Sequence, residues 1–440
     1  MMKRAIIATL LIGFLCNSGL AQEFDKTKLD LYFDALEANN KFMGSVAVSR
    51  NGSIIYSRST GYADFENKIK ADENSRYRIG SISKTFTTVL VMKAVEQNKL
   101  ALDQTMGKYF PSIKNAGKIT IENLLYHRSG IHSFTSDSTY LTWNTQGKTE
   151  NEMIEIIARA GIDFEPDTKS EYSNSNFVLL TFILEKTFGL SYAELLQEYI
   201  VKPVGLSNTS LGGKINTSKK DCKSYKYLDT WVLEPETDIS IPLGAGGIVS
   251  TPGDLVKFSD ALFEEKLLSS ESLEKMKTVK GQYGMGIFNI PFYDKVGYGH
   301  TGGIDAFSSV FSYFSEGNIS FAMTCNGSNY NTNNISIAVL SAILNRPYEI
   351  PEFSTNVVRS EDLDSYLGVY SSSQIPISIT VTRKNNTLIA QGSGQASFPL
   401  EPAGKDKFKF DQADLVMEFN PANNTMILKQ GGGQFEFNRD

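Results

Sequence analysis

The stretch Tyr77–Thr88, YRIGSISKTFTT, decides the fold expected for this chain of 440 residues. It places Ser81 and Lys84 three positions apart, after a glycine and before apolar residues, which is typical of a loop that enters a helix. Residues at this spacing share one face of a helix. A serine becomes a good nucleophile when a desolvated lysine takes its proton. The stretch therefore predicts a nucleophile and its activator at a helix N-terminus, where free backbone N–H groups suit an oxyanion.

The Ser-x-x-Lys spacing is not specific by itself, because many surface helices contain it. It occurs again at Ser272 and Lys275, within the charged run EEKLLSSESLEKMK. We interpret this second run as a solvated helix face. Ser81 therefore needs partners elsewhere in the chain.

Two further segments carry suitable groups. Tyr172-Ser173-Asn174 precedes a predicted helix, and a phenol near an ammonium can share or lose its proton and act as a general base. The Asn174 amide can bind a substrate carbonyl. His300-Thr301-Gly302-Gly303 lies on a predicted strand, where glycines permit close approach of a ligand. Taken singly, each segment also fits a structural role, as a capped tyrosine or a glycine-rich hairpin.

In the order Ser-x-x-Lys, Tyr-x-Asn, His-Thr-Gly, the three elements resemble the serine β-lactamase and penicillin-binding-protein superfamily. The match is to its class C-like branch of D-alanyl-D-alanine carboxypeptidases, D-aminopeptidases and esterases. Similar stretches recur over residues 40–345, among them FMGSVAVSRNG, GKITIENLLYHRSGI, VKPVGLSNT and GAGGIVSTPGDLVKF. The resemblance implies an α+β fold, with an antiparallel sheet between helices on both faces and an additional all-helical region.

The resemblance also implies a role for each element. Ser81 is the acylated nucleophile, Lys84 activates it, and Tyr172 is the general base and proton shuttle. The implied substrate-binding residues are Asn174, His300 and Thr301, and the implied oxyanion hole is formed by the backbone N–H groups of Ser81 and Gly303. The reaction is two-step acyl transfer through an acyl-serine, without cofactor or metal. The implied substrates are small amides or esters, above all D-amino-acid peptides cleaved by a carboxypeptidase or aminopeptidase.

Three departures from the family pattern bear on the substrate. His300 stands where true class C β-lactamases carry a lysine that receives the substrate carboxylate, so efficient β-lactam hydrolysis is not expected. Arg128 replaces a usual threonine, and Glu165-Pro166-Asp167 replaces a usual Pro-Gly turn. An esterase or a weak β-lactamase stays open as an alternative. So does an inactive penicillin-binding or cell-envelope interaction protein, although Ser81, Lys84 and Tyr172 are all present.

Composition and the N-terminal segment bear on the binding partners and the localisation of the protein. A net charge of −6 argues against nucleic acid as a partner, which leaves a small molecule or short peptide. Residues 1–21 have the charged start, apolar run and small-x-small end of a secretory signal. We therefore expect cleavage after Ala21 and a secreted or periplasmic protein without a transmembrane segment. A lipid anchor on Cys16 is disfavoured because Leu15 is not small. The sequence does not predict an oligomeric state.

Hydrophobic patterns divide the mature chain. Residues 22–350 contain strands, a helical block and then strands again, which predicts one hydrolase domain whose sheet is built from both of its ends. A linker is expected at 351–360. Residues 361–440 form short alternating runs that resemble a lipocalin-like β domain. The strands expected there are Ile375–Thr382, Thr387–Gln391, Phe408–Phe410, Leu415–Phe419, Met426–Gln430 and Phe435–Phe437. Whether Cys222 and Cys325 pair stays open.

Overall fold

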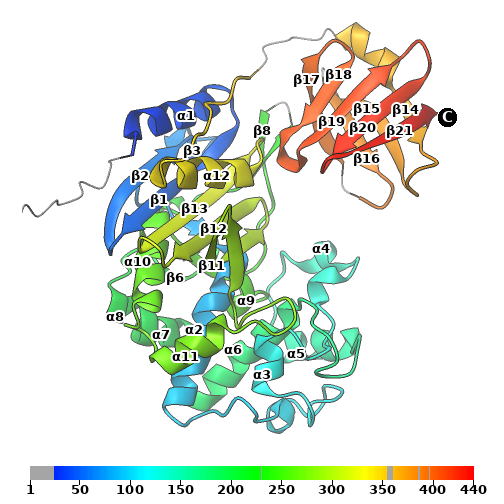
Figure 1. Ribbon diagram of the computed structural model, residues 1–440. Coiled ribbons are helices and arrows are strands. Elements are labelled where there is room, and N and C mark those ends of the chain that lie inside the picture. Colours follow the sequence, from blue (N-terminus) through cyan, green and yellow to red (C-terminus); the bar gives the residue numbers. More distant parts are fainter. Residues whose placement is uncertain (1–23, 229, 354–359, 385–386, 396) are drawn as a thin grey trace, which may run out of the picture.

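The computed structural model describes residues 24–228, 230–353, 360–384, 387–395 and 397–440. They form an α+β domain followed by a β-barrel (Figure 1). The expected fold class is therefore confirmed. The expected signal at 1–21 and most of the expected linker lie outside the described residues, so both stay predictions. Within the described ranges, no helix is long and apolar enough to cross a membrane.

The first domain is built on an antiparallel sheet with the strand order β10-β11-β12-β13-β1-β2. Its strands are β1 (Phe42–Arg50), β2 (Ser53–Thr60), β10 (Phe288–Phe292), β11 (Lys295–Ile304), β12 (Phe307–Phe314) and β13 (Ile319–Ser328). β1 and β2 form a hairpin across Asn51-Gly52, where both residues have positive φ as the Asn-Gly signal predicts. β1 also pairs with β13, with Ser45 opposite Thr324. The two ends of the domain therefore share one sheet, as expected.

Helices cover both faces of this sheet (Figure 1). On one face, α1 (Lys26–Ala38) and α12 (Thr332–Ile343) bury an aromatic and aliphatic core against the strands. On the other face, α10 (Pro252–Phe263) packs on β1 and β13, and Phe258 stacks on Phe86 of α2 (Ser83–Glu96) with ring centroids 3.7 Å apart. The second face therefore anchors the helix that follows Ser81.

A helical region completes this domain. Its helices are α3 (Ile121–Leu125), α4 (Tyr140–Trp143), α5 (Glu150–Ala160), α6 (Asn174–Phe188), α7 (Tyr192–Leu196), α8 (Lys202–Val204), α9 (Leu243–Gly246) and α11 (Ser270–Lys277). The short strands beside it are β3 (Tyr62–Asp64), β4 (Ile69–Lys70), β5 (Tyr77–Arg78), β6 (Ser210–Leu211), β7 (Tyr225–Leu228), β8 (Thr230–Leu233) and β9 (Ile248–Ser250). In α11, Lys275 lies 2.8 Å from Glu271 in an exposed ion pair. The second Ser-x-x-Lys is therefore part of a surface helix.

The C-terminal domain is a closed antiparallel barrel, β14 to β21 in sequence order. Its strands are β14 (Gly368–Ser371), β15 (Ser378–Lys384), β16 (Thr387–Gly392), β17 (Phe398–Gly404), β18 (Lys407–Phe410), β19 (Leu415–Asn420), β20 (Thr425–Gln430) and β21 (Gly433–Arg439). The sequence analysis missed β14 and β17. β17 contains two prolines, which argue against a strand, and β14 is short but closes the barrel by pairing with both β15 and β21. The lipocalin resemblance stays a prediction.

Candidate active site

Ser81 lies in a turn of 3₁₀ helix, Gly80–Ile82, that leads directly into α2. Lys84 is in the first turn of α2 and is fully buried. Its Nζ lies 3.0 Å from Ser81 Oγ, 2.7 Å from Asn174 Oδ1 and 2.6 Å from the carbonyl oxygen of Ala245. Burial lowers the pKa of Lys84 well below its usual value. A neutral amine donates two hydrogens, which the Asn174 and Ala245 oxygens accept, so its lone pair is left for the Ser81 hydroxyl.

Tyr172 comes from the loop before α6, the helix that begins at Asn174. The Lys84 Nζ lies 4.9 Å from the centroid of the Tyr172 ring. Burial raises the pKa of Tyr172, and a hydrogen bond with Ser81 opposes the shift in part. The resting phenol therefore carries its proton. The hydroxyl, the amine and the phenol from two distant segments converge at one place, as the sequence analysis expected.

The glycines of β11 allow this strand to lie directly on the turn that holds Ser81. A Cβ on Gly302 would come within 2.0 Å of the Ile79 carbonyl oxygen, so no larger residue fits there. Gly80 has a φ of +50°, and a Cβ on it would lie 2.7 Å from the Gly303 nitrogen. This close approach places the Gly303 backbone beside Ser81, where an oxyanion hole requires it.

His300 and Thr301 are placed differently. Thr301 is exposed, whereas His300 is buried behind the strand, with its Nδ1 2.5 Å from the Thr301 carbonyl oxygen and its ring 4.1 Å from that of Phe288. Burial, helped by the nearby Lys84, lowers the pKa of His300 to about 3. His300 is therefore neutral at physiological pH and cannot supply the positive charge that a lysine would bring here.

Sequence analysis missed one buried histidine beside the site. The ring of His127 stacks on that of Tyr172 with centroids 4.4 Å apart, and its Nδ1 accepts a hydrogen bond of 3.1 Å from the Ser173 N–H. Burial and Lys84 lower the pKa of His127 well below its usual value. Its φ is +55°, which is unusual for histidine. No periodicity in the sequence indicates this role, because the contacts join residues far apart in the chain.

We expect His127→Ala to lower kcat about 10- to 100-fold with a smaller change in KM, because Tyr172 loses both its stacking partner and the contact that holds its loop. Steady-state kinetics on an amide substrate checks this. His132→Ala is the matched control, because His132 is a more exposed histidine whose Nδ1 lies 2.9 Å from an Asp163 carboxylate oxygen. An unchanged kcat in His127→Ala would contradict the positioning role.

The two loop segments that depart from the family pattern contact each other. Arg128 Nε lies 2.6 Å from Asp167 Oδ1. Asp167 has a φ of +66°, the conformation that glycine adopts at the end of a Pro-Gly turn. Arg128 does not line the pocket next to Ser81. It is therefore a loop arginine that pairs with Asp167, and it does not replace the missing lysine charge.

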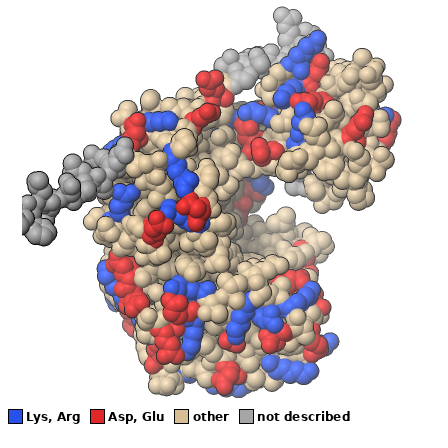
Figure 2. All heavy atoms as spheres, viewed as in Figure 1, with Lys and Arg blue, Asp and Glu red and all other residues tan. Residues whose placement is uncertain are grey.

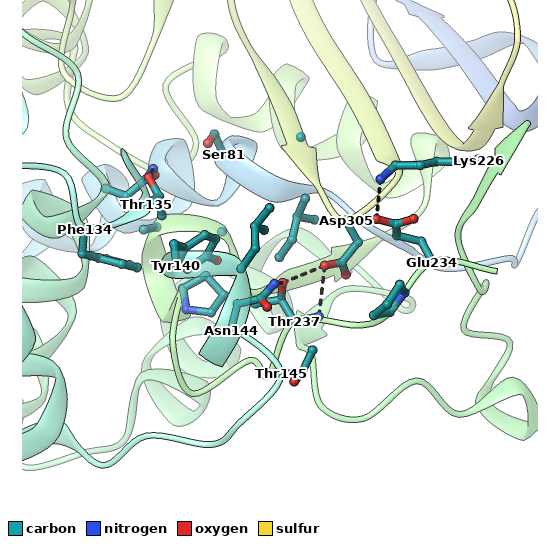
Figure 3. A pocket seen from close by; sticks show the side chains of 18 residues that line it. Ser81, Phe134, Thr135, Tyr140, Asn144, Thr145, Lys226, Glu234, Thr237 and Asp305 are labelled. Atoms are coloured by element: carbon teal, nitrogen blue, oxygen red, sulfur yellow. Dashed lines mark hydrogen bonds and ion pairs between the residues drawn. The ribbon is translucent and has the colours of Figure 1, made fainter. Parts of the chain in front are cut away.

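A pocket of about 550 Å³ opens beside Ser81 (Figure 3). Ser81, Asn174 and Gly303 line it, whereas His300 and Thr301 do not. One wall is apolar, from Phe134, Tyr140 and Leu141. Figure 3 shows Lys226, Glu234 and Asp305 on the side opposite the apolar wall. Apart from Asp305, which lies in the turn between β11 and β12, these walls come from the segments around 130–170 and 213–240, which no sequence pattern defined.

Charges at the far side of this pocket are paired. Asp305 accepts hydrogen bonds from Thr237 and lies 3.0 Å from an Arg78 nitrogen. Glu234 lies 2.5 Å from Lys226, which is the one cation among the described lining residues. Arg78 also pairs with Glu236, so three carboxylates, those of Glu234, Glu236 and Asp305, face two cations, Arg78 and Lys226, at this side of the pocket. This balance favours a cationic group over an anionic one.

The fold and the site together define a class of enzyme, a serine hydrolase in which a serine and a buried lysine share a helix start beneath an antiparallel sheet. The model of the family described as Beta-lactamase matches residues 30–345, and the chain belongs to this family.

Several relatives are similar to this chain. Penicillin-binding protein 4* of Bacillus subtilis is 25% identical over 93% of this chain and 97% of its own length. Teichoic acid D-alanine hydrolase of Staphylococcus aureus is 31% identical, over 55% of this chain and 58% of its own. The crystal structure of D-amino acid amidase from Ochrobactrum anthropi, complexed with D-phenylalanine, superposes with a TM-score of 0.64 at 25% identity. That match covers 72% of this chain and 98% of the amidase.

Proposed function

We propose that this serine hydrolase cleaves amides or esters of D-amino acids that carry a free α-ammonium group. The observation that carries the proposal is the buried Lys84 amine, 3.0 Å from Ser81 Oγ and held by two acceptors. Similarity to a D-amino acid amidase and a teichoic acid D-alanine hydrolase supports the D-amino acyl group. The neutral His300 and the pocket carboxylates support a substrate without an anionic carboxylate at the scissile residue.

The chemistry proceeds in two steps. Lys84 accepts the Ser81 proton as Oγ attacks the substrate carbonyl, and the backbone N–H groups of Ser81 and Gly303 stabilise the oxyanion. The amine or alcohol leaves with a proton delivered through the Tyr172 hydroxyl. Because the Tyr172 phenol is protonated at rest, Lys84 is the base and Tyr172 relays the proton. Water then hydrolyses the acyl-serine by the same groups in reverse.

A substrate panel tests the proposal. We expect D-alanine p-nitroanilide to be cleaved with a kcat/KM at least about tenfold above that of its N-acetylated form, because the charged pocket recognises a free ammonium. The same margin is expected over the L-enantiomer, as the similarity to D-amino acid hydrolases suggests. The panel also contains an acetylated D-Ala-D-Ala peptide and nitrocefin. Faster cleavage of either would contradict the proposal and favour the carboxypeptidase or β-lactamase alternative.

A further inference from the structure

A second hollow of about 500 Å³ lies between the hydrolase domain and the barrel. Figure 2 shows the surface hollowed where the barrel lies beside the first domain. Three segments form its walls: the β7–β8 hairpin, the ends of the central strands β12 and β13, and the ends of β17 and β18 in the barrel. The lining residues are Tyr225, Lys226, Tyr227, Leu228, Ala306, Ser308, Cys325, Ser328, Tyr330, Thr332, Ser397, Phe398, Pro399, Phe410 and Gln412. We call this hollow the interdomain groove.

Polar contacts fix the barrel wall of the groove in place. Lys41, only 3% exposed in the hydrolase domain, forms ion pairs with Glu401 and Asp411 of the barrel. Asn329 also donates a hydrogen bond to Glu401, and the Gln412 amide donates one to the Ser328 carbonyl oxygen. A nearly buried lysine held by two carboxylates requires a defined geometry. These contacts therefore fix the position of the barrel against the hydrolase domain, and with it the shape of the groove.

The lining of the groove selects a chemistry. It combines aromatic rings with neutral hydroxyl and amide groups, and Lys226 is the one charged side chain among the described lining residues. Phe398 and Phe410 stack on each other with centroids 4.7 Å apart. Aromatic faces pack against apolar ring surfaces, while hydroxyls and amides bind polar substituents. An uncharged ring with many hydroxyls, such as a sugar, presents both kinds of surface.

The groove adjoins the pocket at Ser81. Lys226 on β7 lines both cavities, and it forms an ion pair with Glu234, which follows β8. The Lys226 side chain is 58% exposed, and such ion pairs hold weakly. A ligand that extends beyond the Ser81 pocket therefore reaches the groove past this lysine.

We propose that the interdomain groove is a saccharide-binding site, which holds the carbohydrate part of a substrate whose D-amino acyl group reacts at Ser81. Only the orientation of the substrate rests on the proposed function. The site itself rests on the groove and its lining.

Tryptophan fluorescence tests this binding directly. The chain has two tryptophans, and Trp143→Phe leaves Trp231, whose ring centroid lies 5.0 Å from that of Tyr227 in the groove wall. Chitotetraose, an uncharged oligosaccharide of N-acetylglucosamine, is the probe. We expect a saturable change in Trp231 fluorescence that persists when Ser81 is replaced by alanine. Because binding is measured without turnover, failure of the proposed function would not mimic failure of this site.

Variants locate the site. We expect Phe398→Ala to weaken chitotetraose binding roughly tenfold, as loss of a stacked ring does. Ser397→Arg is a second variant, because Ser397 is exposed and a long side chain there occupies the groove without altering a core or adding a fluorophore. It should abolish the change. Tyr293→Ala, at a ring that is 65% exposed outside the groove, is the matched control and should leave binding unaltered. Absence of a saturable change in Trp231 fluorescence, or a change that survives Ser397→Arg, would overturn the proposal.

Discussion

Replacing Ser81 with alanine is expected to lower kcat/KM for D-alanine p-nitroanilide by roughly 10⁴-fold or more, to the background of the assay. The reason is chemical, because no acyl-enzyme forms without the hydroxyl that Lys84 faces at 3.0 Å. A fluorophosphonate should label the wild-type chain at Ser81, and mass spectrometry of the peptides identifies the adduct. The variant should not be labelled.

The chain contains its own control for this experiment. Ser272 and Lys275 repeat the same spacing on α11, but there Lys275 pairs with Glu271 in solvent. We expect Ser272→Ala to retain full activity and full labelling. Activity that survives in Ser81→Ala, or an adduct on another residue, would reject the assignment of the nucleophile.

Replacing Lys84 with methionine is expected to lower kcat by roughly 10³-fold, because methionine fills the same space but offers no basic lone pair to the serine proton. The wild-type rate should rise with pH as Lys84 loses its proton, and level off above its pKa. Burial places that pKa well below the 10.5 of a free lysine. This increase of the rate with pH is caused by deprotonation of the Lys84 amine, so Lys84→Met should not show it. A pH–rate profile of both proteins measures this.

Lys84 also bears on stability. Between its lowered pKa and 10.5, the unfolded chain binds a proton that the folded chain does not, so the free energy of unfolding should rise with pH across that window. Lys84→Met should lack this contribution. Denaturant titrations at several pH values test it, and they show at the same time that the variant is folded. An identical pH dependence in both proteins would contradict the neutral amine.

Local sequence patterns predicted some strands of the barrel, but they missed strands whose stability depends on the closing of the barrel. Alternation revealed strands such as β19 and β20, whose partners lie one turn away. β14 and β17 escaped because β14 is stabilised by pairing with β21 at the far end of the domain, and β17 carries prolines that only its neighbours compensate. Cys222 and Cys325 are both free and buried, which no spacing in the sequence could decide.

By itself, the sequence determined the serine–lysine pair, because the spacing of two residues in one helix turn is a local property of the backbone. It also determined the antiparallel sheet and the glycines that let β11 approach Ser81. Only the tertiary structure decided the pKa shifts at the site. The pKa values of Lys84, His127 and His300 are lowered because segments far apart in the chain exclude water from these groups, and desolvation depends on everything packed around a group. The pocket and the groove were decided in the same way, by loops and a barrel whose positions no local pattern encodes.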